Sequence, residues 1–160
     1  MKHLILIRHG KSSWDYNVDD KDRPLKERGI VDAHLVASKF SSQNIEINAV
    51  FSSPAIRALH TCSIFLRELD IPFATLEVHE ALYDFSGDGI VPFVKNLPNN
   101  LNKVLLFGHN NAFTNVVNTW GNQYIENVVT SGLVHLSFNV DAWQDVSKGN
   151  TEQTMFPKQL

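Results

Sequence analysis

The chain has 160 residues and a formal net charge of −3, and 43% of its residues are hydrophobic while 19% are charged. This balance is typical of a globular protein and excludes a disordered one, and the length suits one compact domain spanning residues 1–160. A net acidic chain offers no general basic surface for nucleic acid, so an anion site would have to be a local pocket.

Cys62 is the only cysteine, so the chain can form neither an internal disulfide nor a thiolate cluster for zinc. The apolar run at residues 4–7 ends at Arg8 and is too short for a signal peptide or a membrane span. We therefore expect a cytoplasmic, soluble monomer that binds neither nucleic acid nor a membrane.

The first half of the chain predicts two strands and two helices. Residues 3–7 form a nearly continuous apolar run, which indicates a buried strand of a parallel sheet. After a polar loop at residues 10–22, apolar residues at helical spacing predict a helix over residues 25–41. A strand at residues 49–51 follows, and Ser53 and Pro54 are expected to cap and begin a second helix.

The second half continues the alternation. We expect strands at residues 76–78, 103–107 and 133–138, an edge strand at residues 153–156, and helices over residues 90–97 and 112–120. Asp88 is the expected cap of the first of these helices. Alternating strands and helices predict an α/β fold, a three-layer sandwich around a mostly parallel sheet.

Four cationic or imidazole side chains follow three of the expected strands. Arg8 and His9 follow the first strand, Arg57 lies shortly after the second, and His109 follows the strand at residues 103–107. Ligands of such sheets bind beyond the carboxyl ends of the strands, so these side chains should converge at one edge. Arginine forks and helix N-termini bind phosphate oxygens, and a neutral imidazole can accept a phosphoryl group.

Each of these residues also has a simpler interpretation. A histidine such as His9 can be a core residue, an arginine in a first helical turn such as Arg57 can be merely solvated, and His109 can cap the next helix. Arg23 can form an ordinary ion pair within its loop, because Asp20 and Asp22 lie beside it. The convergence at the strand ends favours a site for His9, Arg57 and His109.

These segments resemble those of the histidine phosphatase superfamily. Residues 8–10 match its RHG motif, and the continuation at residues 11–14 is similar to the SixA-type phosphohistidine phosphatases. Three further blocks follow in family order, at residues 22–29, 53–61 and 108–110. The resemblance implies a phosphoglycerate mutase-like fold and a metal-independent phosphatase without a cofactor. His9 would be the nucleophile, Arg8, Arg57 and His109 would hold the transferring group, and Arg23 would add a phosphate contact.

The general acid that many superfamily members use is not clearly marked. Glu80 lies about where the family places it, Asp84 is an alternative, and the reaction can also proceed without one, because an imidazole leaving group can carry its own proton. The resemblance and the absence of a long enclosing insertion favour a phosphohistidine-bearing protein as substrate. A small phosphate ester, or a non-catalytic phosphate-binding module, remains the alternative, and a mutase is disfavoured.

Overall fold

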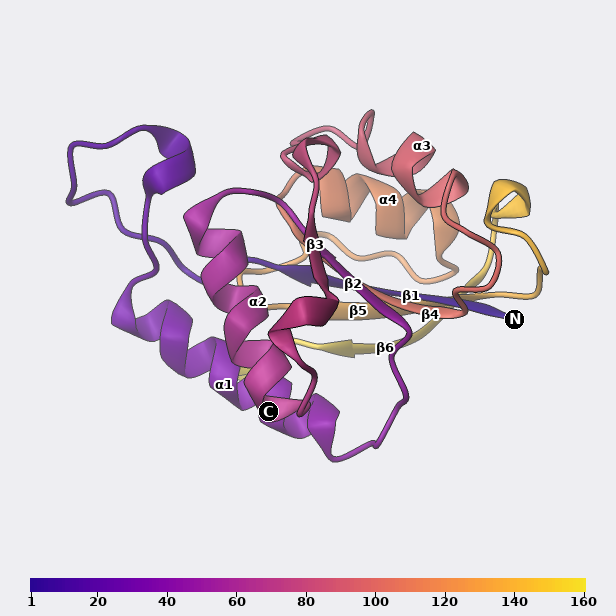
Figure 1. Cartoon of the computed structure of the whole chain (residues 1–160), viewed down its shortest axis with the longest axis horizontal. Helices are drawn as coiled ribbons and strands as arrows, with labels where there is room; N and C mark the ends of the chain where they lie inside the picture. The colour runs from indigo at the N-terminus through magenta and orange to yellow at the C-terminus, as the bar shows by residue number, and fades with distance from the viewer.

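The computed structural model describes residues 1–160, which form a six-stranded sheet covered by helices on both faces (Figure 1). The strand order is β3-β2-β4-β1-β5-β6. The strands are β1 (Lys2–Arg8), β2 (Ala49–Ser52), β3 (Leu76–Val78), β4 (Lys103–Gly108), β5 (Leu133–Phe138) and β6 (Asn150–Met155). The helices are α1 (Glu27–Ser41), α2 (Ile56–Glu68), α3 (Ile90–Lys95) and α4 (Ala112–Trp120).

Only β5 runs against the other strands. β1, β2, β3 and β4 pair in parallel, whereas β5 is antiparallel to both β1 and β6. The predicted mostly parallel α/β sandwich is therefore confirmed.

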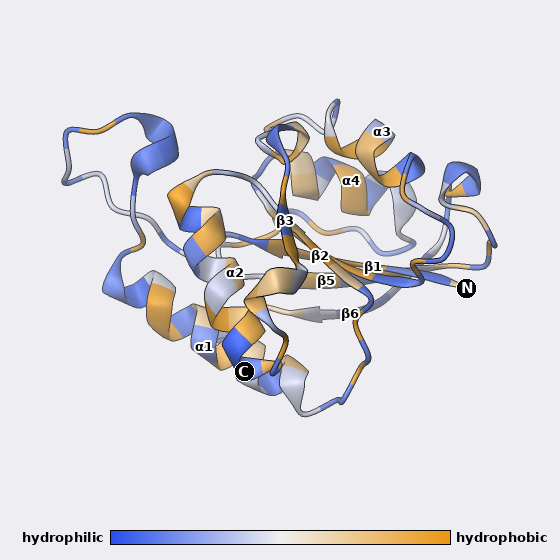
Figure 2. Ribbon diagram, viewed as in Figure 1, coloured by the Kyte–Doolittle hydropathy of each residue, from blue (hydrophilic) through white to orange (hydrophobic).

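The two faces of the sheet build two hydrophobic cores. Along β1, Leu4 and Leu6 pack into the cluster that contains α3 and α4, while Ile5 and Ile7 pack into the cluster that contains α1 and α2. Successive strand residues point to opposite faces, so a continuous apolar run fills both layers. Figure 2 shows this apolar centre, with hydrophilic residues both in the loops and on the helices.

The parallel register aligns the strand ends that the sequence analysis singled out. Arg8 at the end of β1 pairs with Gly108 at the end of β4, and Ser52 at the end of β2 pairs with Phe107. The residues that follow these three strands therefore leave the sheet at the same edge.

Two helix starts were predicted wrongly. The helix expected from residue 25 begins at Glu27, because Leu25 still pairs with Ser12 in an isolated β-bridge. The helix expected from Pro54 begins at Ile56, with Ala55 as its N-cap. The hydroxyl of Ser53 caps no helix, since it lies against His109 instead.

The cap of α3 was also predicted wrongly. Asp88 does not cap this helix, whose N-cap residue is Gly89. The carboxylate of Asp84 accepts hydrogen bonds from the backbone N–H groups of Gly89 and Ile90, both at 3.0 Å. Asp84, four positions before Asp88, thus supplies the acceptor for the N–H groups at the start of α3, because the turn at residues 84–89 folds back on itself.

The last strand begins earlier than expected, at Asn150 rather than residue 153. None of the helices combines the length and the apolar run that crossing a bilayer requires.

Candidate active site

Two histidines lie side by side where β1 and β4 end. His9 follows β1 and His109 follows β4, and their ring centroids are 5.2 Å apart. The backbone N–H of His9 donates to the carbonyl of Gly108 at 3.1 Å, which extends the strand pairing past the sheet edge. Arg57 is the second residue of α2 and only 2% exposed, while His9 is 8% and His109 0% exposed. The structure brings these predicted residues together.

A backbone carbonyl fixes the tautomer of His9. Its Nδ1 lies 2.7 Å from the carbonyl oxygen of Gly10. A carbonyl can only accept, so Nδ1 carries the hydrogen and Nε2 keeps a free lone pair. Burial, together with the charges of Arg57, Arg8 and Arg23, lowers the pKa of His9 to about 4, although the Gly10 hydrogen bond opposes these effects. At neutral pH His9 is therefore uncharged, with the lone pair of Nε2 available.

His109 is held in the other tautomer. The Ser53 hydroxyl lies 2.8 Å from Nε2 of His109, and its oxygen accepts a hydrogen bond from the backbone N–H of Ala55 at 3.2 Å. The Ser53 hydrogen is then free to donate to Nε2, which places the imidazole hydrogen on Nδ1. Burial, together with the electrostatic effects of His9 and Arg57, lowers the pKa of His109 to about 3. His109 is thus a neutral donor.

Three buried donors at this edge have no partner. They are Nε of Arg8, Nε of Arg57 and Nδ1 of His109. A buried polar group without a hydrogen bond is unfavourable, so such groups are usually satisfied by a ligand, an ion or water. A tetrahedral oxyanion carries several acceptors, and two guanidinium groups supply the charge that it needs. The arrangement suits a phosphoryl group.

The chain beside His9 is anchored to α2. The N–H of Gly10 donates to the hydroxyl of Thr61 at 2.9 Å, and that hydroxyl donates to the carbonyl of Arg57 at 2.7 Å. Position 10 must also be glycine, because a Cβ there would lie 2.8 Å from the carbonyl oxygen of Gly29. These contacts hold the chain beside His9 and the start of α2, which carries Arg57, in a fixed relation.

Asp20 is a site residue that the sequence analysis considered only as a partner for Arg23. Its backbone carbonyl accepts from NH1 of Arg57 at 2.6 Å, and its carboxylate accepts from NH2 of Arg57 at 2.8 Å. The hydroxyl of Tyr83 donates to the same carboxylate. Burial raises the pKa of Asp20, but the hydrogen bonds from Tyr83, Arg57 and Arg23 lower it more, to well below the ordinary range. The only sequence signal was the acidic run before Arg23.

Arg23 is buried and bonded within its own loop. Its Nε donates to the carbonyl of Ser13 at 3.1 Å, NH2 to the hydroxyl of Ser12 at 2.6 Å, and NH1 to Asp20 at 3.2 Å. Trp14 stacks on the guanidinium, 3.2 Å from the ring centroid. The loop ion pair that the sequence left open is therefore present, and a phosphate contact by Arg23 stays a prediction.

The two candidates for a general acid are engaged elsewhere. The Glu80 side chain is 73% exposed and forms an ion pair with Lys21 at 2.9 Å. Asp84 accepts hydrogen bonds from four backbone N–H groups, those of residues 86, 87, 89 and 90. Burial raises the pKa of Asp84, but these bonds lower it more, so the net shift is downward. A carboxylate held in this way is a poor proton donor.

No group of three or more His, Cys, Asp or Glu side chains is placed to hold a metal ion. The charges that lower the pKa of His9 are those of Arg57, Arg8 and Arg23.

Comparison with solved structures supports this fold over the whole chain. The protein histidine phosphatase SixA complexed with tungstate aligns with a TM-score of 0.82 and 23% identity over 98% of both chains. A mycobacterial glucosyl-3-phosphoglycerate phosphatase aligns with a TM-score of 0.68 and 14% identity over 96% of this chain and 98% of that one. At these identities the likeness concerns the fold.

Curated relatives match a shorter region. A 2,3-bisphosphoglycerate-dependent phosphoglycerate mutase of Gloeothece citriformis is 43% identical over 75 residues, which are 44% of this chain and 31% of the relative. The corresponding mutase of Nitrobacter winogradskyi is 37% identical over 70 residues, 42% of this chain and 34% of the relative. The chain thus matches about a third of the length of these mutases.

The family model of the histidine phosphatase superfamily (branch 1) matches residues 4–89, more than half of the chain. This region contains Arg8 and His9 at the end of β1 and Arg57 in the first turn of α2. The chain belongs to branch 1 of the histidine phosphatase superfamily.

Proposed function

We propose that the protein is a phosphatase that works through a covalent phosphohistidine on His9 and acts on phosphohistidine in signalling or phosphorelay proteins. The observation that carries the proposal is that a free imidazole nitrogen lies beside hydrogen-bond donors that have no partner in the protein. Nε2 of His9 is free because Nδ1 is bound by Gly10, and three buried donors without partners lie on Arg8, Arg57 and His109.

In the first step, the lone pair of His9 Nε2 forms a bond to phosphorus while the bond from phosphorus to the substrate nitrogen breaks. The departing electron pair stays on the substrate imidazole, which leaves neutral because its other nitrogen carries a proton. Arg8, Arg57 and Nδ1–H of His109 bind the equatorial oxygens, so the transfer rests on positioning and electrostatic stabilisation. No side-chain acid is required for this leaving group.

In the second step, a water oxygen forms a bond to phosphorus, and the bond from phosphorus to Nε2 of His9 breaks. One hydrogen of the water remains on the new hydroxyl and the other leaves with inorganic phosphate as its acidic proton. His9 returns to its starting tautomer, because the hydrogen stays on Nδ1 and is donated to the Gly10 carbonyl throughout. The cationic groups perform the charge stabilisation for which kinases use magnesium, so we propose a metal-independent reaction.

The chain forms no long segment that would cover the site, which favours a substrate whose phosphoryl group is carried by a protein. Between the end of α2 and the start of β4, the chain forms only the three-residue strand β3, short 3₁₀ helices and the six-residue α3. None of these is long enough to enclose a small molecule. The structural likeness to a protein histidine phosphatase agrees with this choice, whereas the matching mutases act on a small metabolite.

The test is release of phosphate from a phosphohistidine-bearing phosphotransfer domain, with a metal chelator present. We expect turnover by the wild type and by His34→Ala, an exposed histidine on α1, and none by His9→Ala. Rapid acid-free quenching with radiolabelled substrate should trap label on the wild type and on His34→Ala, but not on His9→Ala.

Turnover by His9→Ala would remove His9 as nucleophile. Activity on aryl or sugar phosphates without activity on the phosphotransfer domain would shift the substrate class to small esters. If no phosphate is released from any of these substrates, a phosphate-binding module without catalytic activity would be favoured.

A further inference from the structure

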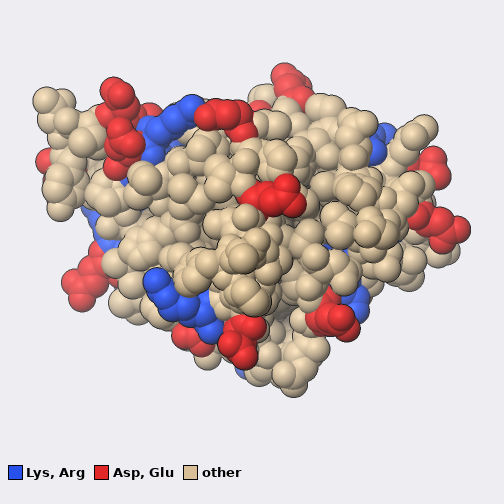
Figure 3. Space-filling model, in the orientation of Figure 1, with Lys and Arg blue, Asp and Glu red and all other residues tan.

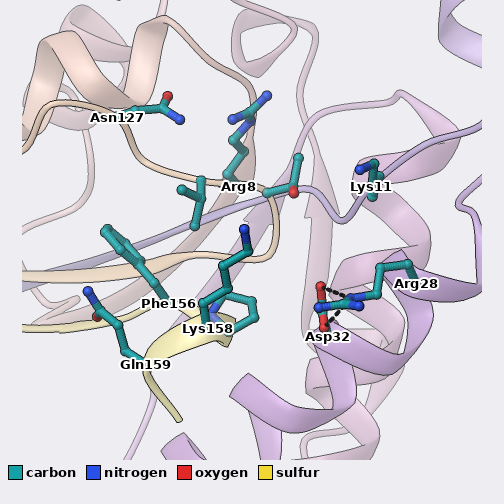
Figure 4. A pocket seen from close by; sticks show the side chains of 11 residues that line it. Arg8, Lys11, Arg28, Asp32, Asn127, Phe156, Lys158 and Gln159 are labelled. Carbon is teal, nitrogen blue, oxygen red and sulfur yellow. Dashed lines mark hydrogen bonds and ion pairs between the residues drawn. The ribbon is translucent and has the colours of Figure 1, made fainter.

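A second pocket lies beside the candidate active site, with a volume of about 630 Å³ (Figure 4). It shares Arg8 with that site but includes neither His9 nor Arg57. Lys11 from the loop after β1, Arg28 and Asp32 from α1, and Lys158 line it. Figure 4 shows Lys158 extended toward the space beneath Arg8, with the Arg28–Asp32 pair across from it.

The pocket is strongly basic in a chain whose net charge is −3. Its four cations, Arg8, Lys11, Arg28 and Lys158, face a single carboxylate, that of Asp32. Over the face drawn in Figure 3, by contrast, basic and acidic side chains are scattered. An excess of three positive charges in one hollow therefore reflects a local arrangement that attracts an anionic ligand.

Most of these cations are free to bind. The side-chain amino groups of Lys11 and Lys158 form neither a hydrogen bond nor an ion pair. Arg28 binds both oxygens of Asp32 through its Nε alone, at 3.1 Å, so its two terminal amino groups are unoccupied. The one acid of the pocket is thus already satisfied without consuming the donors.

The uncharged lining also presents donors. Oδ1 of Asn127 accepts from the side-chain amide of Asn110 at 2.7 Å, which leaves the Asn127 amino group without a partner. NH1 of Arg8 donates to the carbonyl of Val128 at 2.9 Å, and its NH2 group remains free. A hollow that offers donors and few acceptors suits carboxylates or phosphates. Its volume lies in the range of about 300–1,000 Å³ that a whole small-molecule ligand occupies. The pocket is therefore larger than a single phosphate group needs.

We propose that this pocket docks an acidic segment of the phosphorylated substrate protein, with Asp or Glu side chains next to the phosphohistidine. The inference rests on the proposed function, because it names which phosphohistidine proteins the site prefers. Arg8 connects the two regions, since it ends β1 immediately before His9 and also lines the pocket. Lys11, Arg28 and Lys158 are all exposed, so a macromolecular surface can reach them, unlike the buried cations of the catalytic site.

The first experiment measures docking without catalysis. A fluorescent, unphosphorylated peptide with a central histidine flanked by Asp and Glu is titrated with protein at low salt. The double variant Lys11→Glu/Lys158→Glu should bind at least about tenfold more weakly than the wild type, because attraction becomes repulsion. The control Lys39→Glu/Lys148→Glu makes the same charge change at exposed lysines outside the pocket and should stay within about twofold.

The second experiment uses the same peptides phosphorylated on histidine. For the acidic peptide, Lys11→Glu/Lys158→Glu should raise KM at least about tenfold and leave kcat within about twofold, since docking precedes the chemistry. With Asn and Gln in place of Asp and Glu, and with phosphoramidate as a small substrate, the variant should match the wild type.

Equal losses in the two double variants, or equal losses with the neutral peptide, would overturn the docking proposal. A loss confined to a small bisphosphate ester would also overturn it and assign the pocket to a second phosphate. Peptide binding that depends on Lys11 and Lys158, without any phosphohistidine hydrolysis, would instead support the pocket and contradict the proposed function.

Discussion

The Asp20 carboxylate lies 2.8 Å from NH2 of Arg57, and the Asp20 carbonyl lies 2.6 Å from NH1 of the same guanidinium. Asp20 thus accepts from both terminal amino groups of the buried Arg57, whose Nε has no hydrogen-bond partner. The loop between β1 and α1 extends from this edge of the sheet at the left of Figure 1. Asp20 therefore orients Arg57 and also places a negative charge near the proposed phosphate position.

Asp20→Asn separates these two effects. The amide oxygen can still accept from Arg57, but the negative charge is removed, so inorganic phosphate should inhibit at a concentration about three- to tenfold lower than for the wild type. Asp20→Ala loses the orientation as well and should lower kcat/KM. Product-inhibition kinetics measure both, and an unchanged inhibition constant in Asp20→Asn would show that the carboxylate does not oppose anion binding.

The acidic limb of activity should lie well below the ordinary pKa of histidine. The nucleophilic form of His9 is neutral, and burial lowers its pKa to about 4. As pH falls, His9 therefore stays active through pH 6 and is protonated only near pH 4. NMR titration of the imidazole nitrogens in the free enzyme, with His34 as an exposed reference, measures this directly. A midpoint near 6.5 for His9 would contradict the burial argument.

The same shifts predict how stability depends on pH. Burial lowers the pKa of His9 and His135 to about 4 and that of His109 to about 3. Between these values and about 6.5, the unfolded chain binds more protons than the folded one, so stability falls as pH decreases through this window. Each unit of lowering corresponds to about 1.4 kcal/mol. Urea unfolding at pH 7 and pH 5 tests this, and equal stabilities at the two values would count against it.

Ser53→Ala should reduce the rate more than it reduces the stability. The change removes the hydroxyl that lies 2.8 Å from Nε2 of His109 and fixes its tautomer. Without it, Nδ1–H of His109 is no longer presented reliably, and kcat should fall about tenfold to a hundredfold. Ser63→Ala, which removes a hydroxyl bonded only to the His60 carbonyl, is the matched control. Equal kcat values for the two variants would exclude the proposed role.

Glu80→Gln should leave hydrolysis of phosphohistidine within about twofold of the wild type, because an imidazole leaving group needs no positioned acid. The exposed Glu80–Lys21 pair should also contribute little to stability. A kcat loss of about a hundredfold on alcohol phosphate esters with no loss on phosphohistidine would identify Glu80 as an acid that only poorer leaving groups require. A large loss on phosphohistidine itself would make Glu80 part of the main mechanism.

The sequence alone determined the sheet and the core of the site. The four central strands, β1, β2, β4 and β5, each carry an apolar run. The parallel arrangement of β1, β2 and β4 requires that the residues after them meet at one edge. Arg8, His9, Arg57 and His109 could therefore be grouped without any knowledge of their contacts. The RHG tripeptide and the later blocks then indicated the family.

Only the tertiary structure decided what the short polar side chains do. Ser53 was predicted as a helix cap because local rules favour it, yet its hydroxyl faces His109, 56 residues away. Asp84 rather than Asp88 accepts a hydrogen bond from the backbone N–H of Ile90 at the start of α3, and Asp20 reaches across 37 residues to Arg57. A small hydroxyl or carboxylate can satisfy several alternative donors, and which one it meets depends on how loops are brought together by the packing of distant elements.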